Sequence, residues 1–179
     1  MTERIPIASD HAGFELKAKL RGALERRGFV VEDLGPARDA STDYADYAHP
    51  LAERVSNGEV ERGILLCGTG LGMSYAANRH AHVRAAVAWT PEIAELSRRH
   101  NDANVLVLPA RFVSDRDAEA ILDAWLATPF DGGRHGRRIE KIETTDAARA
   151  DEAARHHPDH RAGLDDQGPG GHAPDPRGR

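Results

Sequence analysis

Short apolar runs alternate with amphipathic segments over residues 1–143. The apolar runs cover residues 5–8, 29–31, 63–66, 83–88 and 105–108. Runs this short and this apolar are typical of strands that are buried on both faces, rather than half-exposed strands. The pattern therefore predicts five short, buried strands.

Amphipathic segments follow these runs. Helical spacing covers residues 13–27, 44–55 and 114–127, and further helices are expected up to Ala77 and from Pro91. Because strands and helices alternate, we predict a parallel sheet covered by helices on both faces. Ligands of such folds bind beyond the carboxyl ends of the strands. That rule points to residues 9–11, 67–72, 89–90 and 109–111.

The character of the chain changes at residue 144. Residues 145–155 are rich in alanine and charge and could continue a helix, whereas 157–179 are rich in Gly, Pro, Asp and Arg. Such a segment buries too little apolar surface to offset its ordering entropy. We therefore predict one domain over 1–143, then a helix end and disordered tail over 144–179. Its histidines lack metal-site spacing and are interpreted as solvated: His156, His157, His160 and His172.

Composition limits the partners. The formal net charge is −5 and no Lys/Arg-rich block occurs, which argues against nucleic acid as the main partner. A few arginines can still bind an anionic small molecule. The single cysteine cannot form an intramolecular disulfide. No run approaches the ~20 apolar residues of a membrane span, and the N-terminus lacks a signal-peptide pattern, so we expect no membrane partner and a cytoplasmic protein.

Cys67 is the strongest candidate for chemistry. It follows a predicted buried strand and opens the glycine-rich loop Cys-Gly-Thr-Gly-Leu-Gly. Glycines let the backbone approach a ligand closely, and N–H groups at a helix start attract an anion, including a thiolate. A buried structural cysteine beside a tight turn explains the position equally well.

Three other interpretations of this loop fail on a residue that their chemistry needs. A dinucleotide-binding loop needs G-x-G-x-x-G, whereas Gly68, Gly70 and Gly72 give G-x-G-x-G. A nucleoside-triphosphate loop needs Gly-Lys-Ser/Thr, which is absent. A cysteine phosphatase loop needs arginine where Met73 stands.

Other polar residues carry two interpretations each. Asp10 could orient a sugar hydroxyl or cap the next helix, and His11 could bind phosphate or carry protons. His100 could be catalytic or could only complement a helix dipole. Arg134 and Arg138 share one helical face, which suits an oxyanion, although a solvated helix start explains them too.

Five segments, in order and spread over residues 4–143, resemble one family. They are Ser-Asp-His-Ala-Gly-Phe at 9–14, Asp-Tyr at 43–44, Cys-Gly-Thr-Gly-Leu-Gly-Met-Ser at 67–74 with Ala-Ala-Asn at 76–78, Arg-His-Asn-Asp-Ala-Asn at 99–104, and Gly-Gly-Arg-His at 132–135 with Arg138. The family is that of ribose-5-phosphate isomerase B and galactose-6-phosphate isomerase. Any one segment would be a weak signal, but five in register are specific.

The resemblance implies a Rossmann-like three-layer α/β/α sandwich with a five-stranded parallel sheet. It also implies a homodimer, or a dimer of dimers, with shared active sites and a C-terminal helix that extends to the partner subunit. The expected substrate is a small phosphorylated sugar. Enediol chemistry needs no cofactor and no metal, and the sequence shows no cluster of metal ligands.

The same resemblance assigns the reacting groups. Cys67 would move the proton between C1 and C2 of the open-chain sugar, and Thr69 would relay it to oxygen. The enediolate would be stabilised by the loop and by a serine: Gly68, Gly70, Leu71, Gly72 and Ser74.

The remaining assignments concern ring opening and binding. His100 would open the furanose ring, while Asp10 and Tyr44 place the ring oxygen and hydroxyls. Asn101 would hold another hydroxyl. The phosphate would be bound by His11, Arg111, Arg134 and Arg138, the last two from the partner subunit.

Ribose 5-phosphate and ribulose 5-phosphate are the first expected substrate pair. Erythrulose 4-phosphate, allose 6-phosphate and galactose 6-phosphate are alternatives, because similar sequences serve several sugars. A non-catalytic sugar-phosphate sensor is an alternative of another class. A redox switch at Cys67 is disfavoured because the chain has no resolving cysteine.

Overall fold

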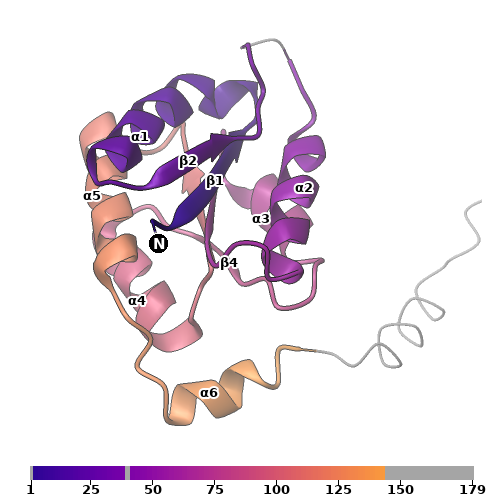
Figure 1. Cartoon of the computed structure of the whole chain (residues 1–179), viewed down its shortest axis with the longest axis vertical. Coiled ribbons are helices and arrows are strands. Elements are labelled where there is room, and N and C mark those ends of the chain that lie inside the picture. Colours follow the sequence, from indigo (N-terminus) through magenta and orange to yellow (C-terminus); the bar gives the residue numbers. More distant parts are fainter. Residues whose placement is uncertain (1, 39–40, 144–179) are drawn as a thin grey trace, which may run out of the picture. The chain divides into compact units, whose positions relative to one another are not determined.

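The structure is a computed structural model that describes residues 2–38 and 41–143 (Figure 1). The expectations for residues 144–179, including the four histidines there, lie outside these residues. No helix in the described part of the chain is long and apolar enough to cross a membrane.

Five parallel strands form one sheet, as the apolar runs predict. The strands are β1 (Arg4–Ser9), β2 (Val30–Asp33), β3 (Gly63–Cys67), β4 (Ala85–Val87) and β5 (Val105–Pro109), in the spatial order β2-β1-β3-β5-β4. β3 and β5 are buried along their whole length, whereas the edge strand β2 has no fully buried residue, so the prediction of five buried strands is wrong there. The continuous apolar pattern of β3 and β5 follows from their central position.

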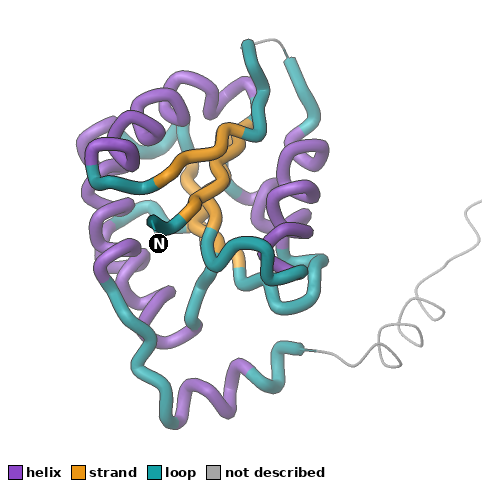
Figure 2. The backbone as a smooth tube through the Cα atoms, viewed as in Figure 1, coloured by secondary structure: helices purple, strands orange, loops and turns teal. Residues whose placement is uncertain are grey.

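Helices cover both faces of the sheet, so the predicted three-layer α/β/α fold is confirmed (Figures 1 and 2). On one face lie α1 (Phe14–Arg26), α4 (Pro91–Asn101) and α5 (Asp115–Ala127), and on the other lie α2 (Tyr44–Ser56) and α3 (Leu71–Ala77). Alternate residues of β3 enter different cores. Leu66 packs with the first group of helices, and Cys67 packs with the second.

The chain changes direction across the sheet after β2. It passes from β1 to β2 on one side, then returns through α2 to β3 on the other side of β1. The loops after β1 and β3 therefore lie at the switch point beyond the carboxyl ends of the strands, where ligands of this fold class bind. The backbone N–H of Asp10 donates to the carbonyl of Leu66 at 3.1 Å, which joins the two loops.

Two histidines join α2 to the turn after α3. His49 Nδ1 lies 2.9 Å from His80 Nε2, and burial lowers the pKa of His80 from its ordinary value of 6.5. The charge of His49 lowers that pKa further, while Glu53 opposes the change. The folded protein therefore disfavours protonated His80.

This pair predicts a pH-dependent loss of stability. Because the unfolded chain binds the proton at a higher pH than the folded chain, the contribution of His80 is full above the unfolded pKa and is lost as pH falls through the folded pKa. We expect the free energy of unfolding, measured in urea from about pH 7.5 to about pH 5, to fall less steeply in His80→Gln than in the wild type. Identical slopes would contradict this role.

Candidate active site

Cys67 lies at the carboxyl end of β3, at the switch point between β1 and β3. The residue is 4% exposed, and its Sγ accepts the backbone N–H of Gly70 at 3.1 Å. The thiol is thus buried, free of any disulfide and held against the loop that follows it.

Two side chains from other elements pack on this loop because it contains glycine. A Cβ atom on Gly72 would lie 2.7–2.8 Å from the ring of Tyr44, the first residue of α2. One on Gly68 would lie 3.3 Å from the Cδ and Nε atoms of Arg111. The backbone N–H of Arg111 also donates to the carbonyl of Gly68 at 3.1 Å. A phenol and a guanidinium are therefore placed on the cysteine loop.

Asp10 and His11 complete the polar groups at this edge of the sheet. Asp10 is 7% exposed, and its Oδ1 accepts the N–H of Gly13 at 3.1 Å. The capping role of Asp10 is therefore confirmed, for the turn η1 (His11–Gly13). His11 Nδ1 lies 3.5 Å from the backbone nitrogen of Thr42, which donates to it.

Thr69 and Ser74 differ in their placement. Thr69 is exposed, and its Oγ1 accepts the N–H of Leu71 at 3.3 Å. Ser74 is buried, with its Oγ 3.5 Å from the carbonyl oxygen of Ala85 at the start of β4 and 3.4 Å from Asn78 Nδ2. Its N–H donates to the carbonyl of Gly70. Both Ser74 donors thus have partners within the fold.

His100 and Asn101 lie at the opposite edge of the sheet. They end α4, whose eleven residues run back from the carboxyl end of β4 toward the start of β5. Cys67 pairs in register with Pro109, the last residue of β5. A five-residue strand spans about 13 Å at ~3.3 Å per residue step. Within one chain, therefore, the structure does not bring His100 to Cys67.

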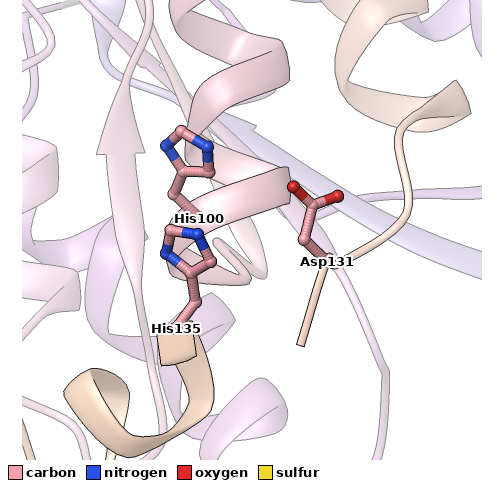
Figure 3. Close-up of side chains that lie close together, drawn as sticks. All are labelled: His100, Asp131 and His135. Carbon is pink, nitrogen blue, oxygen red and sulfur yellow. The ribbon is translucent and has the colours of Figure 1, made fainter. Parts of the chain in front are cut away.

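His100 is part of a compact cluster that the sequence pattern did not reveal (Figure 3). Its ring stacks on the ring of His135, with centroids 4.4 Å apart and an interplanar angle of 3°. The carboxylate of Asp131 lies beside the two rings, and one potential ligand atom from each residue lies within 4.8 Å of the others. No spacing rule links residues 100, 131 and 135, because strand β5, helix α5 and their connecting loops separate the first from the others.

The two arginines of the final helix also belong to this edge. Arg134 and Arg138 are exposed on α6 (Arg134–Ile139), the helix that carries His135. Burial lowers the pKa of the 8% exposed His135, and the charges of His100 and of the two arginines lower it further. The predicted site residues thus form two groups on opposite edges of the sheet. The carboxyl-edge group contains Asp10, His11, Tyr44, the 67–72 loop and Arg111, whereas the amino-edge group contains His100, Asn101, Arg134 and Arg138.

Known proteins match this chain in sequence and in fold, and the matches cover most of its length. The Ribose/Galactose Isomerase family model matches residues 5–142. Ribose-5-phosphate isomerase B of Escherichia coli K12 is 45% identical over 147 residues, which is 82% of this chain and 99% of that protein.

Solved structures give the same result. A ribose 5-phosphate isomerase from Thermotoga maritima superposes with a TM-score of 0.78 and 52% identity, covering 80% of this chain and 99% of that one. Ribose-5-phosphate isomerase B from Mycoplasma genitalium was solved with bound ribulose-5-phosphate. It superposes with a TM-score of 0.76 and 46% identity, covering 79% of this chain and 95% of that one.

Proposed function

Because the chain belongs to the Ribose/Galactose Isomerase family, we propose that it interconverts ribose 5-phosphate and ribulose 5-phosphate through an enediolate, with Cys67 as the base. The activity of a sugar-phosphate isomerase follows from the family. The observation that supports this base is the buried Cys67 thiol, which ends β3 at the switch point of the sheet and accepts the N–H of Gly70.

The chemistry explains why such a cysteine needs its loop. A proton next to a carbonyl is too weakly acidic for a thiolate to remove unless the developing oxyanion is stabilised. One preorganised N–H donor in an oxyanion hole is worth about 2.7–4 kcal/mol, and a positioned base contributes about 10²–10⁴-fold. In the proposed mechanism the backbone N–H groups of residues 68–72 meet the enediolate oxygen, and Thr69 relays the proton between carbon and oxygen. Because both Ser74 donors have partners in the fold, Ser74 supports the loop in this mechanism.

The two groups of residues act together if two copies of the chain pair. In the proposed symmetric dimer the carboxyl-edge group of one subunit faces the amino-edge group of the other. The two-fold symmetry creates two such sites. His100 then opens the furanose ring of a sugar that is bound on the other subunit, and Asn101 holds a hydroxyl. The phosphate lies between His11 and Arg111 of one subunit and Arg134 and Arg138 of the other. Charge-assisted bonds from guanidinium groups suit this anion.

The substrate is tested by a panel of sugar phosphates with four, five and six carbons. We expect kcat/KM to be highest for ribose 5-phosphate, compared with erythrulose 4-phosphate, allose 6-phosphate and galactose 6-phosphate. Coupled enzyme assays measure each rate. A higher kcat/KM for another sugar would change the substrate and keep the reaction, whereas no turnover of any sugar would favour a sensor.

The same panel separates ring opening from proton transfer. A tetrose whose O4 is esterified cannot close a furanose ring, so it needs no ring opening. We therefore expect His100→Ala to lose more activity on ribose 5-phosphate than on the tetrose phosphate, relative to the wild type. Equal losses on both substrates would contradict a ring-opening role.

A further inference from the structure

The amino-edge cluster contains three side chains of metal-binding chemistry. His100 ends α4, Asp131 lies in the loop before α6, and His135 lies in the first turn of α6. One nitrogen of each histidine and one carboxylate oxygen lie within 4.8 Å of one another. Figure 3 shows the carboxylate on one side of the two stacked rings. The proposed reaction uses His100 and assigns no task to Asp131 or His135.

We propose that His100, Asp131 and His135 bind a divalent transition metal such as Zn²⁺, and that the bound metal inhibits the isomerase by occupying the imidazole of His100. The inhibitory half of this proposal rests on the proposed ring-opening function of His100. The binding half rests on the cluster alone. Two imidazoles and a carboxylate match the ligand preference of Zn²⁺, Co²⁺ and Ni²⁺, whereas Mg²⁺ and Ca²⁺ prefer oxygen ligands.

The cluster requires two adjustments before it can bind an ion. The rings of His100 and His135 are stacked and nearly parallel, so their nitrogen lone pairs do not converge, and one ring must rotate about its side-chain bonds. The ligand atoms must also come closer together. Metal–ligand bonds of about 2.0–2.2 Å place neighbouring ligands of a tetrahedral ion roughly 3.4 Å apart. Ligand atoms that now lie within 4.8 Å of one another would therefore close by about 1 Å or somewhat more at the widest pair. Asp131 can supply this movement, because its side chain is 36% exposed and lies in a loop. Three protein ligands leave a coordination position open for water.

Arg99 is the main competitor for the carboxylate. Its guanidinium lies 3.2 Å from Asp131 Oδ2 and 3.4 Å from Oδ1, and it also pairs with Glu95 at 3.3 Å. Carboxylates that bind metals commonly keep an outer hydrogen bond. Asp131 can therefore give one oxygen to the metal and keep the other on Arg99.

Arg134 and Arg138 lie on α6 together with His135. The two arginines repel a cation, so we expect binding to be weaker than in a closed structural zinc site.

Titration of the metal-free full chain with Co²⁺ tests the binding half. Visible absorption of bound Co²⁺ reports the site, and Zn²⁺ is expected to displace the Co²⁺. We expect Asp131→Ala and His135→Ala each to weaken Co²⁺ binding at least tenfold. His49→Ala is the matched control, because it disrupts the other close histidine pair. Histidines after residue 143 are the same in every variant, so they cancel in the comparison.

Inhibition by Zn²⁺ tests the second half. We expect Zn²⁺ to inhibit the wild type, and Asp131→Ala to need at least tenfold more Zn²⁺ for the same fractional inhibition of its own rate. Asp131→Asn, which keeps the shape of the side chain, replaces Asp131→Ala if melting shows that the alanine variant is not folded.

The outcomes separate this proposal from the proposed function. Unchanged Co²⁺ affinity in both folded variants would overturn the metal site and leave the isomerase mechanism intact. Loss of Co²⁺ binding in the variants, with no Zn²⁺ inhibition of the wild type, would support the site and overturn the inhibition. That second result would also argue against His100 in ring opening.

Discussion

Replacing Cys67 with alanine is expected to lower kcat by about 10²–10⁴-fold, because the base that moves the proton between two carbons is lost. KM is expected to change little, since the proposed phosphate and hydroxyl contacts remain. A coupled assay with ribose 5-phosphate measures both constants. Cys67→Ser keeps the size and polarity of the side chain but is a far weaker base at neutral pH, so it should be almost as slow.

Chemical modification gives an independent test of the same residue. Cys67 is the one cysteine of the chain, so iodoacetamide reports on a single thiol. Inactivation should follow its labelling, and substrate should protect the enzyme. The melting temperature of Cys67→Ala is the control, because Cys67 packs in the core beside α2 and α3. Near-wild-type turnover in a folded Cys67→Ala protein would show that another group is the base.

Mixing two inactive variants is expected to restore activity, because the proposed site takes residues from two chains. One variant carries Cys67→Ala, and the other carries His100→Ala with Arg134→Ala. In a mixed dimer one site has both defects and the other has none. After random subunit exchange half of the dimers are mixed, so up to about a quarter of wild-type activity should return.

Two controls make this result specific. Mixing Cys67→Ala with Cys67→Ser should restore nothing, since every site then lacks the thiol. Subunit exchange is verified with differently tagged chains. If exchange occurs and no activity returns, each chain must use its own His100, which would require that residue to reach across the sheet from the edge where α4 ends.

Local patterns were sufficient to predict the elements of the sheet and the position of Cys67. The runs at 63–66 and 105–108 are continuously apolar because β3 and β5 lie in the centre of the sheet. The glycine loop after Cys67 is also visible in the sequence, although its tight packing against Tyr44 and Arg111 is a tertiary contact that only the structure shows. Capping was one of two interpretations of Asp10, and the structure confirms it. The strands, the loop and the cap can be recognised from residues close in the chain.

Side-chain direction inside a helix was less predictable. Ser74 follows the glycine loop directly in the sequence, and the family resemblance assigned it to stabilisation of the enediolate. In the structure its hydroxyl is turned toward Asn78 and β4. That direction depends on how α3 packs against a strand whose position a local pattern does not contain.

The sequence by itself determined the fold class, the buried central strands and the cysteine at a strand end, because burial and chain turns leave periodic local signals. Only the tertiary structure decided that His100 and Cys67 lie on opposite edges of the sheet, and that His100 meets Asp131 and His135. His100 is separated from Cys67 because α4 runs back toward the amino edge of the sheet. The chain returns to this edge after α5 and brings Asp131 and His135 to His100. Both results depend on contacts between residues about 30 positions apart, for which hydrophobic periodicity carries no information.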